Sequence, residues 1–182
     1  MRVAFVLLIC AAGACSRSEP DVDARNASVA EVAEQVRGAT GEQGFVRPGK
    51  WLSQVTVEDV SAPGLPAQVR DQMQGMMAKQ SSYESCLTPE QAKRPKEDFF
   101  AGKDNQCRYE HFTMGDGKID ARMKCSTEGM SQTMEMAGTY SPEAYNMRMT
   151  TKAEGMPGPA SEMSMRMRVD AKRVGECNAK QG

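Results

Sequence analysis

The stretch CRYEHFTMGDGKIDARMKC, residues 107–125, predicts two antiparallel strands joined by a tight turn. Its centre, Gly115-Asp116-Gly117, is a compact hairpin signal. Beyond the turn, apolar residues from Ile119 to Cys125 occupy every second position, and charged residues occupy the positions between them. This period of two is typical of a strand with one buried and one solvated face. The stretch therefore predicts a β-hairpin at the centre of the fold.

The same alternation extends into other parts of the chain. Further strands are predicted at residues 50–58, 81–87, 132–140, 145–152 and 163–172. Short turns rather than helices separate the later strands, which favours an antiparallel meander.

Short helices are predicted at three places. Ser28 and Glu31 have the capping-box spacing and predict a helix over 28–37, while Thr88 and Gln91 predict a single turn beginning at Pro89. Phe99 and Phe100 are expected to anchor the segment after that turn. A helix over 67–79 is expected to pack against the sheet through Val69, Met73, Met76 and Met77. The predicted fold is mainly β: an antiparallel meander sheet, curved or a half-barrel, with one or two short helices packed on it.

Size and charge limit the classes of protein that fit. The chain has 182 residues, which suits one domain of ordinary size. Its 23 basic and 24 acidic residues are nearly balanced, so no nucleic-acid partner is indicated. Aromatic residues make up only 5 %, which is few for a large apolar core. Cross-links are therefore expected to help stabilise the fold.

The N-terminal residues predict export. Arg2 precedes an apolar run from Val3 to Ala12, and Ala12-Gly13-Ala14 places small residues before Cys15. The run is shorter than the ~20 residues that span a bilayer, so residues 1–14 are interpreted as a removed signal peptide. The ending resembles a bacterial lipoprotein box, although Ala12 stands where leucine is usual. This implies lipidation at Cys15, the alternative being an ordinary signal peptide cut nearby.

The remainder divides into three parts. Residues 15–44 are expected to hold the lipid anchor, an extended polar tether from Ser16 to Asn26, and the short amphipathic helix. Nothing before Phe45 has a pattern typical of core. Residues 45–177 form the β-rich domain, and 178–182 are a C-terminal tail.

Four cysteines remain once Cys10 is removed and Cys15 is acylated, and an even number in an exported chain predicts two disulfides. Three pairings are possible. The expected pairing joins Cys86 to Cys107 and Cys125 to Cys177, because each bond then closes one loop without crossing the other. A zinc site is disfavoured, since no two of the cysteines are closely spaced and His111 is the only histidine.

Methionine is unusually frequent, with fifteen residues. Seven recur at a spacing of two and therefore share strand faces: Met134, Met136, Met147, Met149, Met163, Met165 and Met167. Three interpretations are open. The methionines are adaptable core filler, they form a pliable apolar groove for a lipid, peptide or partner protein, or they bind Cu(I), for which soft sulfur ligands are selective. Exposed methionine could also scavenge oxidants.

No catalytic residues are predicted. His111 lies inside a predicted strand, and no nucleophile elbow, P-loop or H-E-x-x-H motif occurs. Paired cysteines cannot act as nucleophiles. The sequence therefore predicts a protein that is not an enzyme and holds no cofactor, with a hydrolase as a remote alternative.

Several short motifs, taken in order, resemble a bacterial family named domain of unknown function 3617. They are Pro48-Gly49-Lys50-Trp51, Pro63-Gly64-Leu65-Pro66, Cys86-Leu87-Thr88-Pro89-Glu90, the pair Cys107 and Cys125, and Lys172-Arg173-Val174-Gly175-Glu176-Cys177. The resemblance covers Phe45 to Cys177 and implies an exported, cysteine-paired, sheet-rich protein without an established activity.

Together these features predict an exported, lipid-anchored, non-catalytic binding or structural module of the cell envelope. The alternative is a methionine-rich periplasmic protein that binds Cu(I) or buffers oxidants. The expected partners are the membrane, through the anchor, and an envelope protein or apolar ligand. Ser16 is not the aspartate that retains many enterobacterial lipoproteins at the inner membrane, so the periplasmic face of the outer membrane is the expected location.

Overall fold

The hairpin of residues 107–125 forms β4 (Cys107–Gly115) and β5 (Lys118–Thr127) in a computed structural model of the chain. The structure describes residues 21–41, 44–77, 81–93, 106–127, 129–155, 157–158 and 161–177. The meander continues from β5 through β6 (Met130–Ser141), β7 (Ala144–Glu154) and β8 (Glu162–Gly175). Each of the predicted strands is present.

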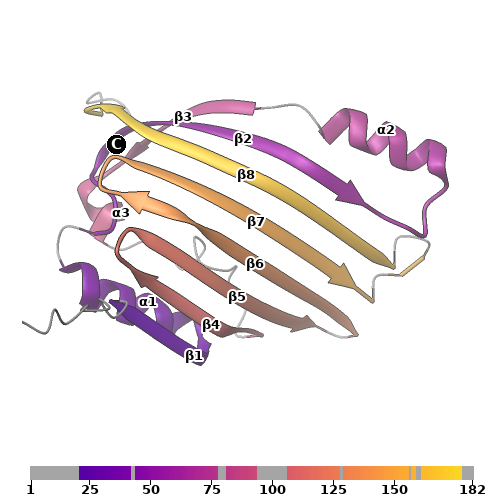
Figure 1. Cartoon of the computed structure of the whole chain (residues 1–182), viewed down its shortest axis with the longest axis horizontal. Coiled ribbons are helices and arrows are strands. Elements are labelled where there is room, and N and C mark those ends of the chain that lie inside the picture. The colour runs from indigo at the N-terminus through magenta and orange to yellow at the C-terminus, as the bar shows by residue number, and fades with distance from the viewer. Residues whose placement is uncertain are drawn as a thin grey trace, which may run out of the picture.

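All the strands join one open antiparallel sheet in the order β1-β4-β5-β6-β7-β8-β2-β3 (Figure 1). The hairpin-like pair β2 (Gly49–Ser61) and β3 (Ser81–Leu87) extends the meander at β8, and β1 (Val22–Ser28) extends it at β4. β1 and β3 are therefore its free edges. The predicted mainly β fold with an antiparallel meander is confirmed.

The first strand corrects one expectation. The predicted tether from Ser16 to Asn26 overlaps β1, which pairs with β4 from Val22 opposite Met114 to Ser28 opposite Arg108. The side chains that β1 buries, Val22, Ala24 and Ala27, are small, and a residue with positive φ, Asn26, interrupts their alternation. The strand pattern is therefore short and weak in the sequence.

The first helix is confirmed and is part of the core. α1 (Val29–Thr40) begins at the predicted capping box: Ser28 Oγ accepts from the Glu31 backbone N–H at 3.2 Å, and Glu31 accepts from the Ser28 N–H at 2.6 Å. Val32, Ala33 and Val36 pack with β1, β4 and β5 around Tyr109 and Phe112. The expectation that nothing before Phe45 contributes to the core is wrong.

The second helix forms but does not cover the sheet. α2 (Ala67–Met77) has no buried residue, and Val69 and Met76 are 46 % and 68 % exposed. A hydrogen bond joins α2 to the sheet: the side-chain amide of Gln74 donates to the Val60 carbonyl at 3.0 Å. Because β3 pairs with β2 only up to Val55, α2 borders the part of the β2 edge that β3 leaves free. The expected packing of its apolar side against the sheet is wrong.

The short turn after β3 is confirmed as α3 (Pro89–Lys93), where Thr88 and Gln91 form the predicted reciprocal pair of hydrogen bonds. Phe99 and Phe100 lie outside the described residues, as do residues 1–20 with Cys15 and residues 178–182. No helix in the described ranges is long and apolar enough to cross a membrane.

The four expected cysteines do form two disulfides, but the expected pairing is wrong. The bonds join Cys107 to Cys125 and Cys86 to Cys177. Cys107 and Cys125 lie directly opposite each other in the β4–β5 hairpin, with Cα atoms 4.0 Å apart. Cys86 on β3 and Cys177 just after β8 flank the same end of β2, which both strands pair with. Sheet register decides the partners, and it nests the Cys107–Cys125 loop inside the Cys86–Cys177 loop instead of placing two loops one after the other.

Candidate functional site

The register of the sheet collects the repeated methionines on one face. Residues directly opposite each other in an antiparallel pair lie on the same face. Across β6, β7 and β8, Met136 lies opposite Met149, and Met149 lies opposite Met167. One row along, Met134 and Met165 both lie opposite Thr151. The face is thus apolar over three neighbouring strands.

In the described part of the chain, a helix packs on one end of this face but not on the other. Near β1 and β4, α1 lies over Phe112 and Met114, which are 0 % and 2 % exposed. Of the seven repeated methionines, Met147 is buried at 7 % exposure, and the other six are half-buried. We call these six, Met134, Met136, Met149, Met163, Met165 and Met167, the methionine surface. Since α2 buries none of its residues, the described part of α2 does not cover this surface.

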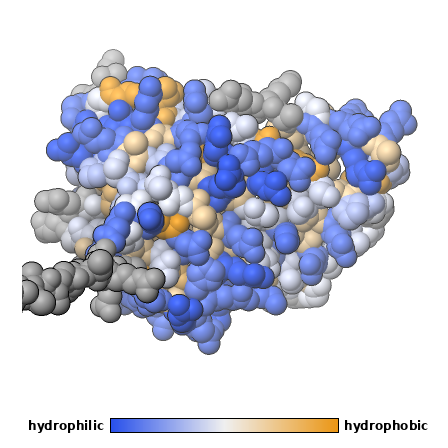
Figure 2. Space-filling view, in the orientation of Figure 1, coloured by the Kyte–Doolittle hydropathy of each residue, from blue (hydrophilic) through white to orange (hydrophobic). Residues whose placement is uncertain are grey.

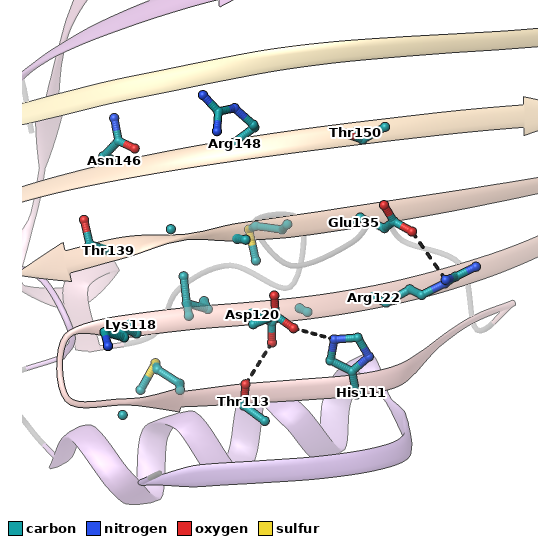
Figure 3. A pocket seen from close by; sticks show the side chains of 17 residues that line it. His111, Thr113, Lys118, Asp120, Arg122, Glu135, Thr139, Asn146, Arg148 and Thr150 are labelled. Carbon is teal, nitrogen blue, oxygen red and sulfur yellow. Dashed lines mark hydrogen bonds and ion pairs between the residues drawn. The ribbon is translucent and has the colours of Figure 1, made fainter.

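The opposite face carries the charged positions of the same strands. The face of the molecule in Figure 2 is mostly hydrophilic, and apolar residues form only small separate patches on it. An open hollow of about 900 Å³ lies over β4 to β7, and its lining includes Ala137, which lies opposite Asp120 on one side and Arg148 on the other. Around Ala137 stand Lys118, Asp120, Arg122, Glu135, Thr139, Asn146, Arg148 and Thr150 (Figure 3).

A β-bulge in β4 turns His111 toward this hollow. The register shifts between Tyr109 and His111, so that Glu110 and His111 share one partner position on β5. His111 Nε2 lies 2.6 Å from an Asp120 carboxylate oxygen, and both side chains are substantially exposed. Arg122 bridges Glu110 at 2.8 Å and Glu135 at 3.3 Å. The strand position predicted for His111 is confirmed.

The chemistry available in the hollow is limited. A histidine–carboxylate pair can act as a general base, but a nucleophile or positioned water must lie within hydrogen-bond reach. The His111 ring pairs with Asp120, and the Thr113 hydroxyl donates to the Asp120 backbone carbonyl. Exposed ion pairs of this kind contribute little stability, because water screens them.

A conventional metal site is not seen in the described part of the chain either. No group of three or more histidine, cysteine, aspartate or glutamate side chains is placed there to hold a metal ion. No buried side-chain nitrogen or oxygen there is left without a hydrogen-bond partner. Methionine thioethers are not among these groups, so a metal site built from methionine is a separate question.

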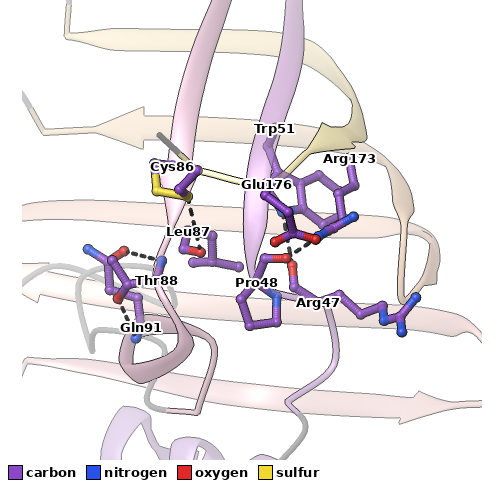
Figure 4. The surroundings of a disulfide bond; sticks show 10 residues. Arg47, Pro48, Trp51, Cys86, Leu87, Thr88, Gln91, Arg173 and Glu176 are labelled. Atoms are coloured by element: carbon purple, nitrogen blue, oxygen red, sulfur yellow. Dashed lines mark hydrogen bonds and ion pairs between the residues drawn. A yellow bond between two sulfur atoms is a disulfide. The ribbon is translucent and has the colours of Figure 1, made fainter. Parts of the chain in front are cut away.

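Several of the motifs behind the family resemblance meet at one corner of the sheet (Figure 4). Trp51 is buried there, donates its indole N–H to the Arg47 carbonyl at 3.0 Å, and packs on Tyr145 with ring centroids 5.6 Å apart. Burial raises the pKa of Tyr145. Arg173 donates to the Pro48 carbonyl at 2.7 Å and also pairs with Glu176.

A glycine is required at this corner. Gly49 has φ of 138°, and a Cβ atom there would lie 2.5 Å from the Gly175 carbonyl oxygen. Next to it, the Cys86–Cys177 disulfide joins β3 to the end of β8 on either side of β2. These motifs therefore hold three strands and their turns together, which is a structural role.

The fold and its faces define a disulfide-linked open-sheet protein with one apolar, methionine-rich face and one charged face. The family described as "Protein of unknown function (DUF3617)" matches residues 46–177, and the chain belongs to it. No curated protein and no solved structure matches the chain. The family match begins at Val46, so β1 and α1 lie outside it.

The structure brings together some predicted site residues and adds others. It groups six of the seven methionines on one accessible surface and separates Met147 into the core. The ring of polar side chains around Ala137 was not predicted. Its signal in the sequence is a small residue between Glu135 and Thr139 on a charged strand face, but only the register shows which residues surround it.

Proposed function

We propose that this chain is an exported, lipid-anchored binding module of the cell envelope. Two observations support export. The N-terminal residues up to Cys15 have the pattern of a lipoprotein signal, and the folded part carries two disulfides, which persist in oxidising compartments. As expected from Ser16, we place the anchored protein at the periplasmic face of the outer membrane.

The anchor would hold the sheet close to the membrane. Cys15 and Val22 are seven residues apart, and a fully extended chain of that length reaches at most about 25 Å. Because β1 is an edge strand of the sheet, a lipid on Cys15 keeps this edge within that distance of the bilayer surface. The domain is therefore positioned for a ligand or partner at the envelope rather than for one that diffuses far from it.

The methionine surface is the observation that carries the binding function. It spans three strands, its side chains are half-buried, and the described part of α2 does not cover it. A contiguous apolar patch that reaches the surface of a folded domain often marks a site where a ligand or partner binds. Unbranched methionine side chains adapt to ligands of different shape. The ligand class is apolar: an acyl chain or the apolar side of a partner segment.

A fluorescent acyl probe tests this binding. The mature chain is titrated with a fatty acid that carries an environment-sensitive fluorophore, and saturable enhancement is expected. Met165→Asp places a charge on the methionine surface and should weaken binding at least about tenfold, because the carboxylate would be desolvated. Ser164→Asp, one residue away on the opposite face, should bind as the unchanged chain does. Equal binding by both variants would refute the methionine surface as the site.

The anchor is tested separately in the native host. The protein is expected to partition into detergent with membranes and to carry a lipid-modified N-terminal cysteine at position 15, detected by mass spectrometry. Cys15→Ser should leave the protein in the soluble envelope fraction or block processing. Recovery of a protein that retains Met1 and has free thiols at the four paired cysteines would contradict export.

Copper handling is the second candidate function, because the side chains of the methionine surface carry thioethers and are partly open to solvent. Sulfur ligands without a titratable proton favour Cu(I) over harder divalent ions. The two candidate functions use the same surface but differ in the ligand, and the acyl probe and a Cu(I) titration separate them.

A further inference from the structure

We propose that Met136, Met149 and Met167 form a Cu(I) site on the methionine surface. This assignment rests on copper handling, the second function proposed above, and names the residues that would carry it. The three methionines lie directly opposite one another on β6, β7 and β8, with Met149 in the middle. Each side chain is half-buried, so part of it is open to solvent.

The spacing of the three positions suits a shared ion. Directly opposite residues of an antiparallel pair have Cβ atoms about 4.5–5.5 Å apart. Methionine has three rotatable side-chain bonds, so the outer two thioethers can turn toward the central one. Met165 lies two residues from Met167 on the same face and is diagonal to Met149, which offers a fourth sulfur.

Packing against the core separates Met149 and Met167 from Met147 and Met134. Met147 is 7 % exposed, and its sulfur lies 2.7 Å from where a Cβ on Gly138 would be, so its side chain fills the space above that glycine. Met134 lies opposite Met123, which is itself buried, and packs against the main core. Met136 also packs against the main core, whereas Met149 and Met167 belong to neither core cluster.

The surroundings of the row favour a soft monovalent ion. The carboxylates next to it in sequence, such as Glu135, alternate to the opposite face of the sheet. Among the described residues at neighbouring positions on this face, the oxygen-bearing side chain is the Thr151 hydroxyl and there is no carboxylate, so a hard cation finds no charged oxygen ligand there, whereas Cu(I) prefers thioether ligands. Thioethers carry no proton to release, so binding should be independent of pH, unlike binding to histidine or thiolate.

A Cu(I) titration of the mature chain tests the site. The measurement is made without oxygen, in competition with a colorimetric Cu(I) chelator, after a thiol assay has shown both disulfides intact. One Cu(I) per chain is expected, with an affinity on the order of micromolar or tighter and no change between mildly acidic and neutral pH. Absence of binding, or binding that requires free thiols, would overturn the proposal.

Conservative variants locate the ion. Met149→Leu keeps the volume and apolar character of the side chain but removes the sulfur, so the domain should fold and Cu(I) affinity should fall at least about tenfold. Met130→Leu and Met76→Leu, which remove exposed sulfur atoms elsewhere, should have no effect. Unchanged affinity in a variant with all three row methionines replaced by leucine would refute the site.

A spectroscopic measurement keeps the test decisive if a variant does not fold. X-ray absorption of the loaded unchanged chain should show only sulfur neighbours around copper, and nitrogen or oxygen neighbours would contradict the thioether row. The acyl probe distinguishes failure of the Cu(I) site from failure of the proposed apolar binding function. If the probe binds and Cu(I) does not, the copper site fails and the apolar binding function stands.

Discussion

At the scale of single residues, Gly138 is fixed by the neighbouring strand. A Cβ atom there would lie 2.1 Å from the Asn146 carbonyl oxygen and 2.7 Å from the Met147 sulfur. Gly138→Ala should therefore destabilise the domain by about 1–3 kcal/mol, the usual range for overpacking. Urea unfolding measures the change. Gly75→Ala, in α2 with nothing within 4 Å of the added Cβ, is the matched control and should be neutral or stabilising by up to about 1 kcal/mol.

Glu31 gives a residue-scale prediction on pH. The Ser28 backbone N–H, which donates to the Glu31 carboxylate, holds the pKa of that carboxyl below its usual 4.5. A lowered pKa means that the stabilisation is present above the unfolded pKa and is lost as pH falls through the folded pKa. The stability deficit of Glu31→Ala should therefore shrink between about pH 7 and about pH 3 in thermal unfolding. A pH-independent deficit would exclude a role for the charged carboxylate at this cap.

At the scale of secondary structure elements, the sequence predicts those whose pattern is local. β4 to β8 and the caps of α1 and α3 could be predicted, because alternation and capping boxes depend on residues a few positions apart. The role of α2 could not be predicted. Its apolar stripe is real, but whether it meets the sheet depends on where β3 stops pairing with β2, which the stripe does not encode.

The β-bulges in β2 and β4 could not be predicted from the sequence either. In β2 the register shifts between Val57 and Asp59, so Val60 is buried although it breaks the alternation that begins at Trp51. In β4 the shift beside Tyr109 sends both Glu110 and His111 to the charged face. An extra residue in one strand leaves no distinct mark in composition, so these side chains could be assigned to a face only from the pairing.

The two disulfides join different elements and should differ in effect. Cys86–Cys177 spans 91 residues and Cys107–Cys125 spans 18. On loop entropy alone, removing the first should cost about 4.6 kcal/mol and removing the second about 3 kcal/mol. Urea unfolding of the two double Cys→Ala variants measures the difference. Peptide mapping under non-reducing conditions checks the connectivity, and a Cys86–Cys107 peptide would contradict the structure.

At the scale of the whole molecule, the candidate surface exists because the sheet is open and unevenly covered. α1 covers the β1–β4 end, while the described residues leave the methionine surface of β6 to β8 only half-buried. The sequence predicted that the methionines share strand faces, because a spacing of two is local. It could not show that three of them align across strands, since alignment depends on the registers of two strand pairs.

The folded domain extends further toward the N-terminus than the family match does. The family match from Val46 to Cys177 leaves out β1 and α1, yet these supply Val22, Val32 and Val36 to the main core. A variant lacking residues 1–44 would uncover Phe112, which is 0 % exposed in the full fold, and would leave β4 as an unpaired edge. Large buried apolar area and a free strand edge both favour association.

We therefore expect the variant lacking residues 1–44 to aggregate or to unfold without a cooperative transition, whereas a variant lacking only residues 1–20 should remain monomeric and unfold in one transition. Size-exclusion chromatography and urea unfolding compare them. Val32→Asp in the longer variant should reproduce part of the defect, because it places a charge in the contact between α1 and the sheet. A stable monomer from residues 45–182 would contradict this expectation. It would mean that the core formed by the rest of the chain is complete before β1 and α1 pack against β4.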